Sequence, residues 1–127
     1  MSATIESDLY NYLSINLLNY NIFNGITSDS VDAEKTVQIF RINSVTSQYN
    51  PTKFITFQIS CRSRDTETAQ QIADEVTNLL RGFSGIMALR NIRVLEIRDL
   101  GMQFENEGRI SFVPLEVLVY VIDWENV

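Results

Sequence analysis

The sequence predicts a single α+β domain in which helices pack on one face of a four-stranded, mostly antiparallel sheet. Three observations lead to this prediction: two segments carry apolar residues at helical spacing, four alternate like strands, and they follow one another in the order α-β-β-α-β-β. The chain has 127 residues, of which 45% are apolar and 20% charged, as expected of one globular domain covering residues 1–127.

The N-terminal segment predicts a helix over about residues 3–18, because apolar side chains recur there every four residues, at Ile5, Leu9, Leu13 and Leu17. Asparagines and Gly25 follow between residues 19 and 25, so we expect the helix to end in a turn there. The polar stretch 27–34 predicts a loop after this turn.

The next two predicted strands cover residues 35–42 and 54–62, and the polar stretch 43–52 predicts the connection between them. In the second strand, apolar and polar residues alternate regularly. We therefore expect one face of this strand to be buried and the other to be wet.

A second helix is the clearest element of the sequence. Asp65 stands at an N-cap position and Gly82 at a C-terminal cap position. The apolar residues between them follow helical spacing: Ala69, Ile72, Ala73, Val76, Leu79, Leu80 and Phe83.

A long C-terminal hairpin is predicted from two further strands, residues 91–104 and 109–123, which are joined by a turn. Gly101 indicates a bulge or bend in the first arm. Pro114 cannot donate to a ladder, so we expect the last strand to be an edge there or to be kinked.

The last strand is apolar on both faces. One face carries Val113, Leu115, Val117, Val119 and Val121, and the other carries Phe112, Leu118, Tyr120 and Ile122. Apolar surface of this size rarely stays exposed, so either a second copy of the chain covers it or the first helix crosses to that face. The first alternative predicts subunit contacts at Leu100, Met102, Phe104, Leu118, Tyr120 and Ile122.

Catalytic and cofactor chemistry finds little support in the residues. Histidine is absent, the five glycines are scattered, and the single Cys61 lies in an apolar alternation typical of a buried thiol. Asp29, Asp32 and Glu34 do not fit a calcium loop, and we expect a solvated acidic loop instead. We therefore predict no enzyme, no cofactor and no metal site.

Charge and targeting features limit the classes of partner and the cell compartment that we expect. The net charge of −6 opposes specific binding to nucleic acid. Arg62 and Arg64 lie where the second strand ends, and Arg90, Arg93 and Arg98 accompany the third. Rather than phosphate contacts, we expect cross-strand pairing with carboxylates such as Glu96, Asp99 and Glu116. The N-terminus does not resemble a secretory signal and no apolar run is long enough for a membrane helix, which predicts synthesis in the cytoplasm without membrane association.

Three stretches together resemble the small tail-terminator (tail-completion) proteins of long-tailed bacteriophages, including those described as minor capsid proteins. They are FITFQISCRSRDTETAQQIADEVTNLLRGF, IRVLEIRDLG and GRISFVPLEVLVYV. The resemblance lies in element order, length and hydrophobic pattern, and it covers most of the chain. No catalytic signature contributes to it.

The resemblance implies a structural virion protein that forms a hexameric ring at the neck of the tail. Such a ring ends polymerisation of the tail tube protein, joins the tail to the head connector or stopper protein, and lets the genomic DNA pass through its lumen. The strong negative charge fits a lumen that DNA does not bind. Residues 27–34 and 43–52 are then candidates for contacts with the tail tube or the connector.

Two alternatives remain open at this stage. The chain is another head-to-tail connector or head-completion component, which differs in whether it binds tube ends or portal rings. Or it is a soluble homo-oligomeric module that binds a small ligand, or a small enzyme, which requires a deep pocket with convergent polar groups.

Overall fold

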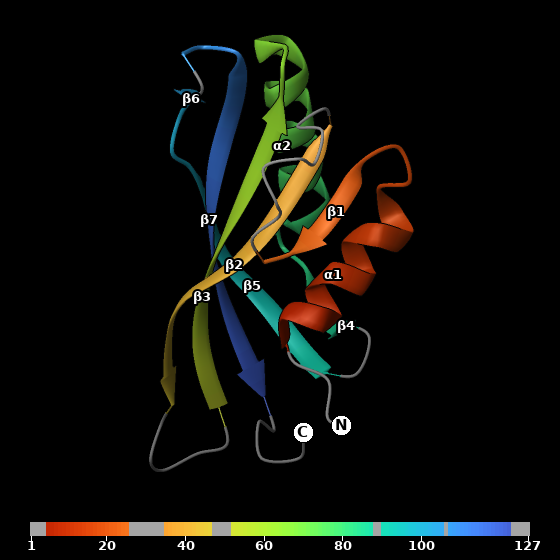
Figure 1. The fold of residues 1–127 in the computed structure, drawn as a ribbon. Coiled ribbons are helices and arrows are strands. Elements are labelled where there is room, and N and C mark those ends of the chain that lie inside the picture. The colour runs from red at the N-terminus through yellow and green to blue at the C-terminus, as the bar shows by residue number, and fades with distance from the viewer. Residues whose placement is uncertain (1–4, 26–34, 47–51, 88–89, 106, 123–127) are drawn as a thin grey trace.

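The computed structural model describes residues 5–25, 35–46, 52–87, 90–105 and 107–122, with only the backbone described at 43–46, 52–53 and 122 (Figure 1). These residues form two helices and seven strands. In chain order the elements are α1 (Ile5–Asn16), β1 (Asn21–Asn24), β2 (Thr36–Thr46), β3 (Thr52–Ser63), α2 (Thr66–Leu80), β4 (Ser84–Met87), β5 (Arg90–Asp99), β6 (Gln103–Glu105) and β7 (Ile110–Ile122). The α+β class is confirmed, but the prediction of four strands is wrong.

The strands form one strongly twisted, curled sheet (Figure 1). Their order is β1-β2-β3-β7-β5-β4, and β6 pairs with β7 beyond the end of β5. Only β1 and β2 run parallel, and every other pairing is antiparallel. The first two predicted strands therefore pair as β2 and β3, and the predicted C-terminal hairpin also forms. The two pairs join through β3 and β7 at the centre of the sheet.

Two of the additional strands lie at the outer edges of the sheet. β1 occupies a segment predicted to be a turn, and β4 occupies the short link after α2. Each has four residues, too few to show an alternation in the sequence. Their strand conformation comes from pairing with a long neighbour, which the local sequence does not encode.

The remaining differences concern where strands continue or break. Residues 43–46, predicted to belong to a polar connection, instead continue β2 after a bulge between Arg41 and Asn43. The predicted third strand is divided into β5 and β6, because Gly101 between them has a φ of 91°. A positive φ interrupts an extended strand, and glycine adopts it without a steric penalty.

Pro114 is buried, and β7 has a strand partner on only one side there, so the prediction of a local edge is confirmed. It pairs with Ser60 of β3 on one side, and on the other its carbonyl accepts a 3.0 Å hydrogen bond from the Leu100 amide. The nitrogen of a strand residue points to the same side as its carbonyl, so the missing N–H faces the break between β5 and β6. The interrupted neighbour is what allows proline in this central strand.

The two helices cover the same face of the sheet. Asp65 caps α2 as predicted, accepting a 3.0 Å hydrogen bond from the Thr68 amide, and Gly82 follows the helix with a φ of 72°. Buried side chains of both helices join the valine row of β7 in one core cluster, from α1 Ile5, Leu9 and Leu13, and from α2 Ala69, Ile72, Ala73, Val76 and Leu80. The alternative that the first helix crosses to the other face is therefore wrong.

Candidate subunit interface

The sheet face opposite the helices has no described helix over it, and we call it the open face. Strand register assigns its members, because directly paired residues point to the same side. From β2, β3 and β7 they are Gln38, Phe40, Phe54, Thr56, Gln58, Ser60, Arg62, Phe112, Pro114, Glu116, Leu118 and Tyr120. The parity prediction that Phe112, Leu118 and Tyr120 point away from the valine row is confirmed.

Exposure differs between the two ends of the open face. Around Ser60 and Pro114 the side chains are buried, whereas Phe54 is 39% exposed and Leu118 and Tyr120 are half-buried. Phe54 lies directly opposite Tyr120, and their ring centroids are 5.0 Å apart at a tilt of 54°. The accessible apolar surface is thus centred on this aromatic pair.

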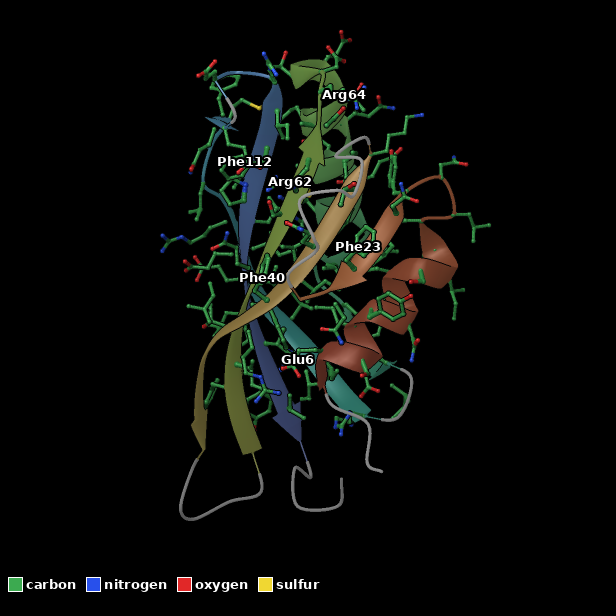
Figure 2. All side chains as sticks on the ribbon, in the orientation of Figure 1. Glu6, Phe23, Phe40, Arg62, Arg64 and Phe112 are labelled. Carbon is green, nitrogen blue, oxygen red and sulfur yellow. The ribbon has the colours of Figure 1, made fainter. Side chains whose placement is uncertain are left out.

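A charged and aromatic cluster closes the other end of the open face. Arg62 of β3 lies over the ring of Phe112 on β7, with its guanidinium carbon 5.6 Å from the ring centroid, and it forms an ion pair with Glu105 of β6 (Figure 2). Burial lowers the pKa of Arg62 from its usual value, but the group stays charged at neutral pH. These contacts attach β6 to the central strands.

The predicted contact residues of the hairpin are distributed over different environments. Leu100 is 41% exposed and Phe104 58%, whereas Met102 is partly buried and packs against the core. The side chain of Ile122 lies outside the described residues. Sequence reasoning did not select Phe54 or Phe40, although their parity with Thr56 and Gln38 would have placed both on the open face.

The ion pairs of Arg98 and Arg90 compare differently with the predicted cross-strand pairing. Arg98 lies 4.0 Å from Glu116 across the β5–β7 ladder, as predicted. Arg90 does not pair along its strand, because it turns into the core and contacts Asp8 of α1. Glu6 of α1 forms an ion pair with Arg41 of β2, so two charged contacts attach α1 to the sheet. The residues next to them in the sequence do not predict either contact.

Chemical groups for catalysis do not gather among the described residues. Cys61 is completely buried, and burial raises the pKa of its thiol well above the usual value. Within the described ranges no group of three or more His, Cys, Asp or Glu side chains is placed to hold a metal ion. Asp29, Asp32 and Glu34 lie outside those ranges. Neither described helix has the length and apolarity needed to cross a bilayer.

One surface groove of about 440 Å³ lies between the end of α1 and α2. Its lining includes Tyr20 and Glu75, whose side chains are hydrogen-bonded to each other, so its two strongest polar groups are already mutually satisfied. The groove is open to solvent, whereas a small-ligand site usually encloses most of its ligand. Its other polar lining residues are Asn16, Asn19 and Asn78.

Two solved structures share the fold of this chain. A chain in the virion of a native gene transfer agent particle is similar to this one over 92% of this chain and 93% of that chain, with a TM-score of 0.68 and 13% identity. A second solved chain matches over 91% of this chain and 89% of its own, with a TM-score of 0.59 and 13% identity. At such identities the likeness concerns the fold. No curated protein matches significantly in sequence.

The family assignment comes from the sequence itself. The family model described as bacteriophage tail terminator protein matches residues 7–112, which span α1 through the first residues of β7. The match includes both helices and the strands that carry the Arg62–Phe112 cluster. This is a family of structural phage tail proteins and not an enzyme family. The chain therefore belongs to the bacteriophage tail terminator protein family.

Proposed function

We propose that this protein assembles into a closed ring, a hexamer by the family resemblance, at the head-proximal end of the phage tail tube. There the ring ends polymerisation of the tube, joins the tail to the head connector, and leaves a lumen through which DNA passes. The observation that carries this proposal is the open face, whose apolar side chains neither described helix covers.

Burial of these side chains on assembly supplies the driving force. Our proposed subunit contacts are Leu118 and Tyr120 of the open face and, from the hairpin, the exposed Leu100 and Phe104. The pairing of Phe104 with Ser111 places Phe104 on the helix side of the sheet, so its contact adds to that of the open face. Met102 and Ile122, the other two predicted positions, belong to the same proposal. Burying a large apolar side chain contributes roughly 1.5–3 kcal/mol, so a few such residues per interface exceed the lower estimates of the cost of association.

Charge supports the passage of DNA. Each protomer has a formal net charge of −6, so a ring of several copies is strongly acidic. An acidic lumen repels the phosphate backbone and does not retain the duplex. The same charge keeps free protomers soluble before assembly.

Light scattering and negative-stain microscopy of the purified protein test the ring. Tyr120→Glu, which adds a charge at the exposed end of the open face, is expected to reduce the measured mass to that of a monomer. Asn78→Glu adds the same charge at an exposed position of α2 and is the matched control. An unchanged mass for Tyr120→Glu would refute the contact assigned to the open face.

The position in the virion is tested with the tail tube protein of the same phage. Added during tube polymerisation, the protein is expected to shorten the tubes and to appear at one end of each. Binding to portal rings with no effect on tube length would instead indicate a head-completion component.

A further inference from the structure

Among the described residues, part of each outer edge of the sheet carries no further strand. β1 pairs with β2 only as far as Ile39, whose carbonyl accepts a 2.9 Å hydrogen bond from the Gly25 amide. β4 pairs with β5 only through Arg93, and the Val94 amide donates to the Phe83 carbonyl at 2.9 Å. Beyond these points, residues 40–46 of β2 and 95–99 of β5 have no described strand on their outer sides.

From these edges we propose that neighbouring protomers of the ring pair strand to strand, β2 of one copy with β5 of the next, so that the sheet continues around the ring. This inference rests on the ring proposed above and adds a second contact between its subunits, because edge pairing alone does not cover Leu118 and Tyr120 on the central strand β7. The partner is a second copy of this chain.

Strand directions permit this contact. β2 is antiparallel to β3, β3 to β7, and β7 to β5, so β2 and β5 run in opposite directions. A rotation about an axis roughly along the strands preserves their direction. It therefore brings β2 of one copy antiparallel to β5 of the next, which is the pairing used throughout the centre of this sheet.

The register selects specific neighbours. One continuous row of paired residues crosses β2, β3, β7 and β5, and it consists of Phe40, Gln58, Glu116 and Arg98. A shift of one residue would exchange the two faces of the sheet, so a zero shift is the simplest pairing that keeps the core face aligned. It places Phe40 of one copy beside Arg98 of the next, both on the open face, where a guanidinium and an aromatic ring attract each other. The pairing is confined to residues 40–43 of β2, because Val45 and Thr46 fall at the level of Arg93 and Ile92, where β4 already pairs with β5.

The two edges also carry matching bulges. Ile42 is the extra residue between Arg41 and Asn43, at 53% exposed, and Leu95 is the extra residue between Val94 and Glu96, at 45%. The register places these aliphatic side chains on either side of the level of Leu118, about one residue step apart along the strands. A zero-shift pairing would bring Ile42 and Leu95 of neighbouring copies together and bury both.

Bulges and charged residues also serve to prevent edge pairing in many monomeric proteins, which is the competing explanation of the same features. Disulfide cross-linking separates the two explanations. The test protein carries Phe40→Cys and Arg98→Cys together. Within one chain these positions are three strand spacings apart, roughly 14 Å, too far for an internal disulfide. The native Cys61 is completely buried and does not take part.

We expect the oxidised double variant to give a ladder of covalent multimers on a non-reducing gel, and each single variant to remain monomeric there. The control pair Phe40→Cys with Ile86→Cys, which places the second thiol at an exposed position of β4, is expected to give no ladder.

The remaining outcomes overturn one proposal or both. A protein that assembles by light scattering but gives no ladder would overturn the edge pairing and leave the ring standing. Covalent dimers from Phe40→Cys alone would indicate two β2 edges meeting symmetrically, and would also overturn it. A protein that stays monomeric at high concentration would overturn the ring, and the edge pairing with it.

Discussion

Asp8 of α1 accepts a hydrogen bond from the guanidinium of Arg90 across 82 positions of the chain, at 2.5 Å and with both side chains almost fully buried. The contact joins α1 to the first residue of β5. A buried ion pair is costly to break on one side only, because the remaining charge has lost its partner without regaining water.

Asp8→Ala is therefore expected to lower the free energy of unfolding by about 3–5 kcal/mol, measured by urea denaturation. Asp8→Leu combined with Arg90→Met removes both charges and should cost less than either single substitution. A double variant as unstable as the sum of the singles would show that the two residues do not act as a pair.

The cap of α2 predicts a dependence of stability on acid. Two hydrogen bonds from Thr68 lower the pKa of Asp65 below its usual value of 3.8. The stabilisation by this carboxylate is therefore present above pH 3.8 and is lost as the pH falls through the lowered pKa of the folded state. Asp65→Ala should unfold at a lower urea concentration at pH 7, whereas Asp65→Asn, which can still cap, should lose less. Equal stability of all three proteins would contradict the capping role.

The environment of Tyr20 predicts that the stability of the fold changes at alkaline pH. Burial and the hydrogen bond to Glu75 raise the pKa of Tyr20 from 10.0 to about 12. The contribution of the neutral phenol is thus complete below pH 10 and is lost as the pH rises through about 12. Ultraviolet titration of the protein against Tyr20→Phe isolates this tyrosine from the other four. Glu75→Gln should lower the measured pKa, and no change would exclude Glu75 as a cause.

Cys61 should be inert in the folded protein. Its side chain is fully buried and burial raises the pKa of the thiol, so neither access nor the reactive thiolate is available. We expect an aromatic disulfide reagent at pH 8 to leave the native protein unmodified and to label one thiol per chain in urea. Rapid labelling without denaturant would show that β3 opens in the native state.

The sequence was informative where one element's own residues decide its conformation. Asp65, the apolar spacing behind it and Gly82 locate α2 almost to the residue. The valine row of β7 likewise identifies its buried face, because alternation is a local property of a strand. In the candidate interface, the same parity correctly separated Leu118 and Tyr120 from that row.

Features that depend on a distant partner were not predictable. β1 and β4 become strands because β2 and β5 lie beside them. The contact of Asp8 with Arg90 requires knowing that α1 lies against the start of β5, and neighbouring residues carry no sign of this. Pro114 itself indicated a local edge, but the origin of that edge was not predictable, because it is the interruption of the adjacent strand at Gly101.

The position of β7 has a consequence for biosynthesis. Although β7 follows every other described element in the chain, it lies in the middle of the sheet, between β3 and β5. A nascent chain on the ribosome can form the β2–β3 hairpin and α2, but it has no central layer against which both helices can pack until β7 has emerged. A translation product that ends before β7 would therefore lack the strand between β3 and β5 and could not complete the core.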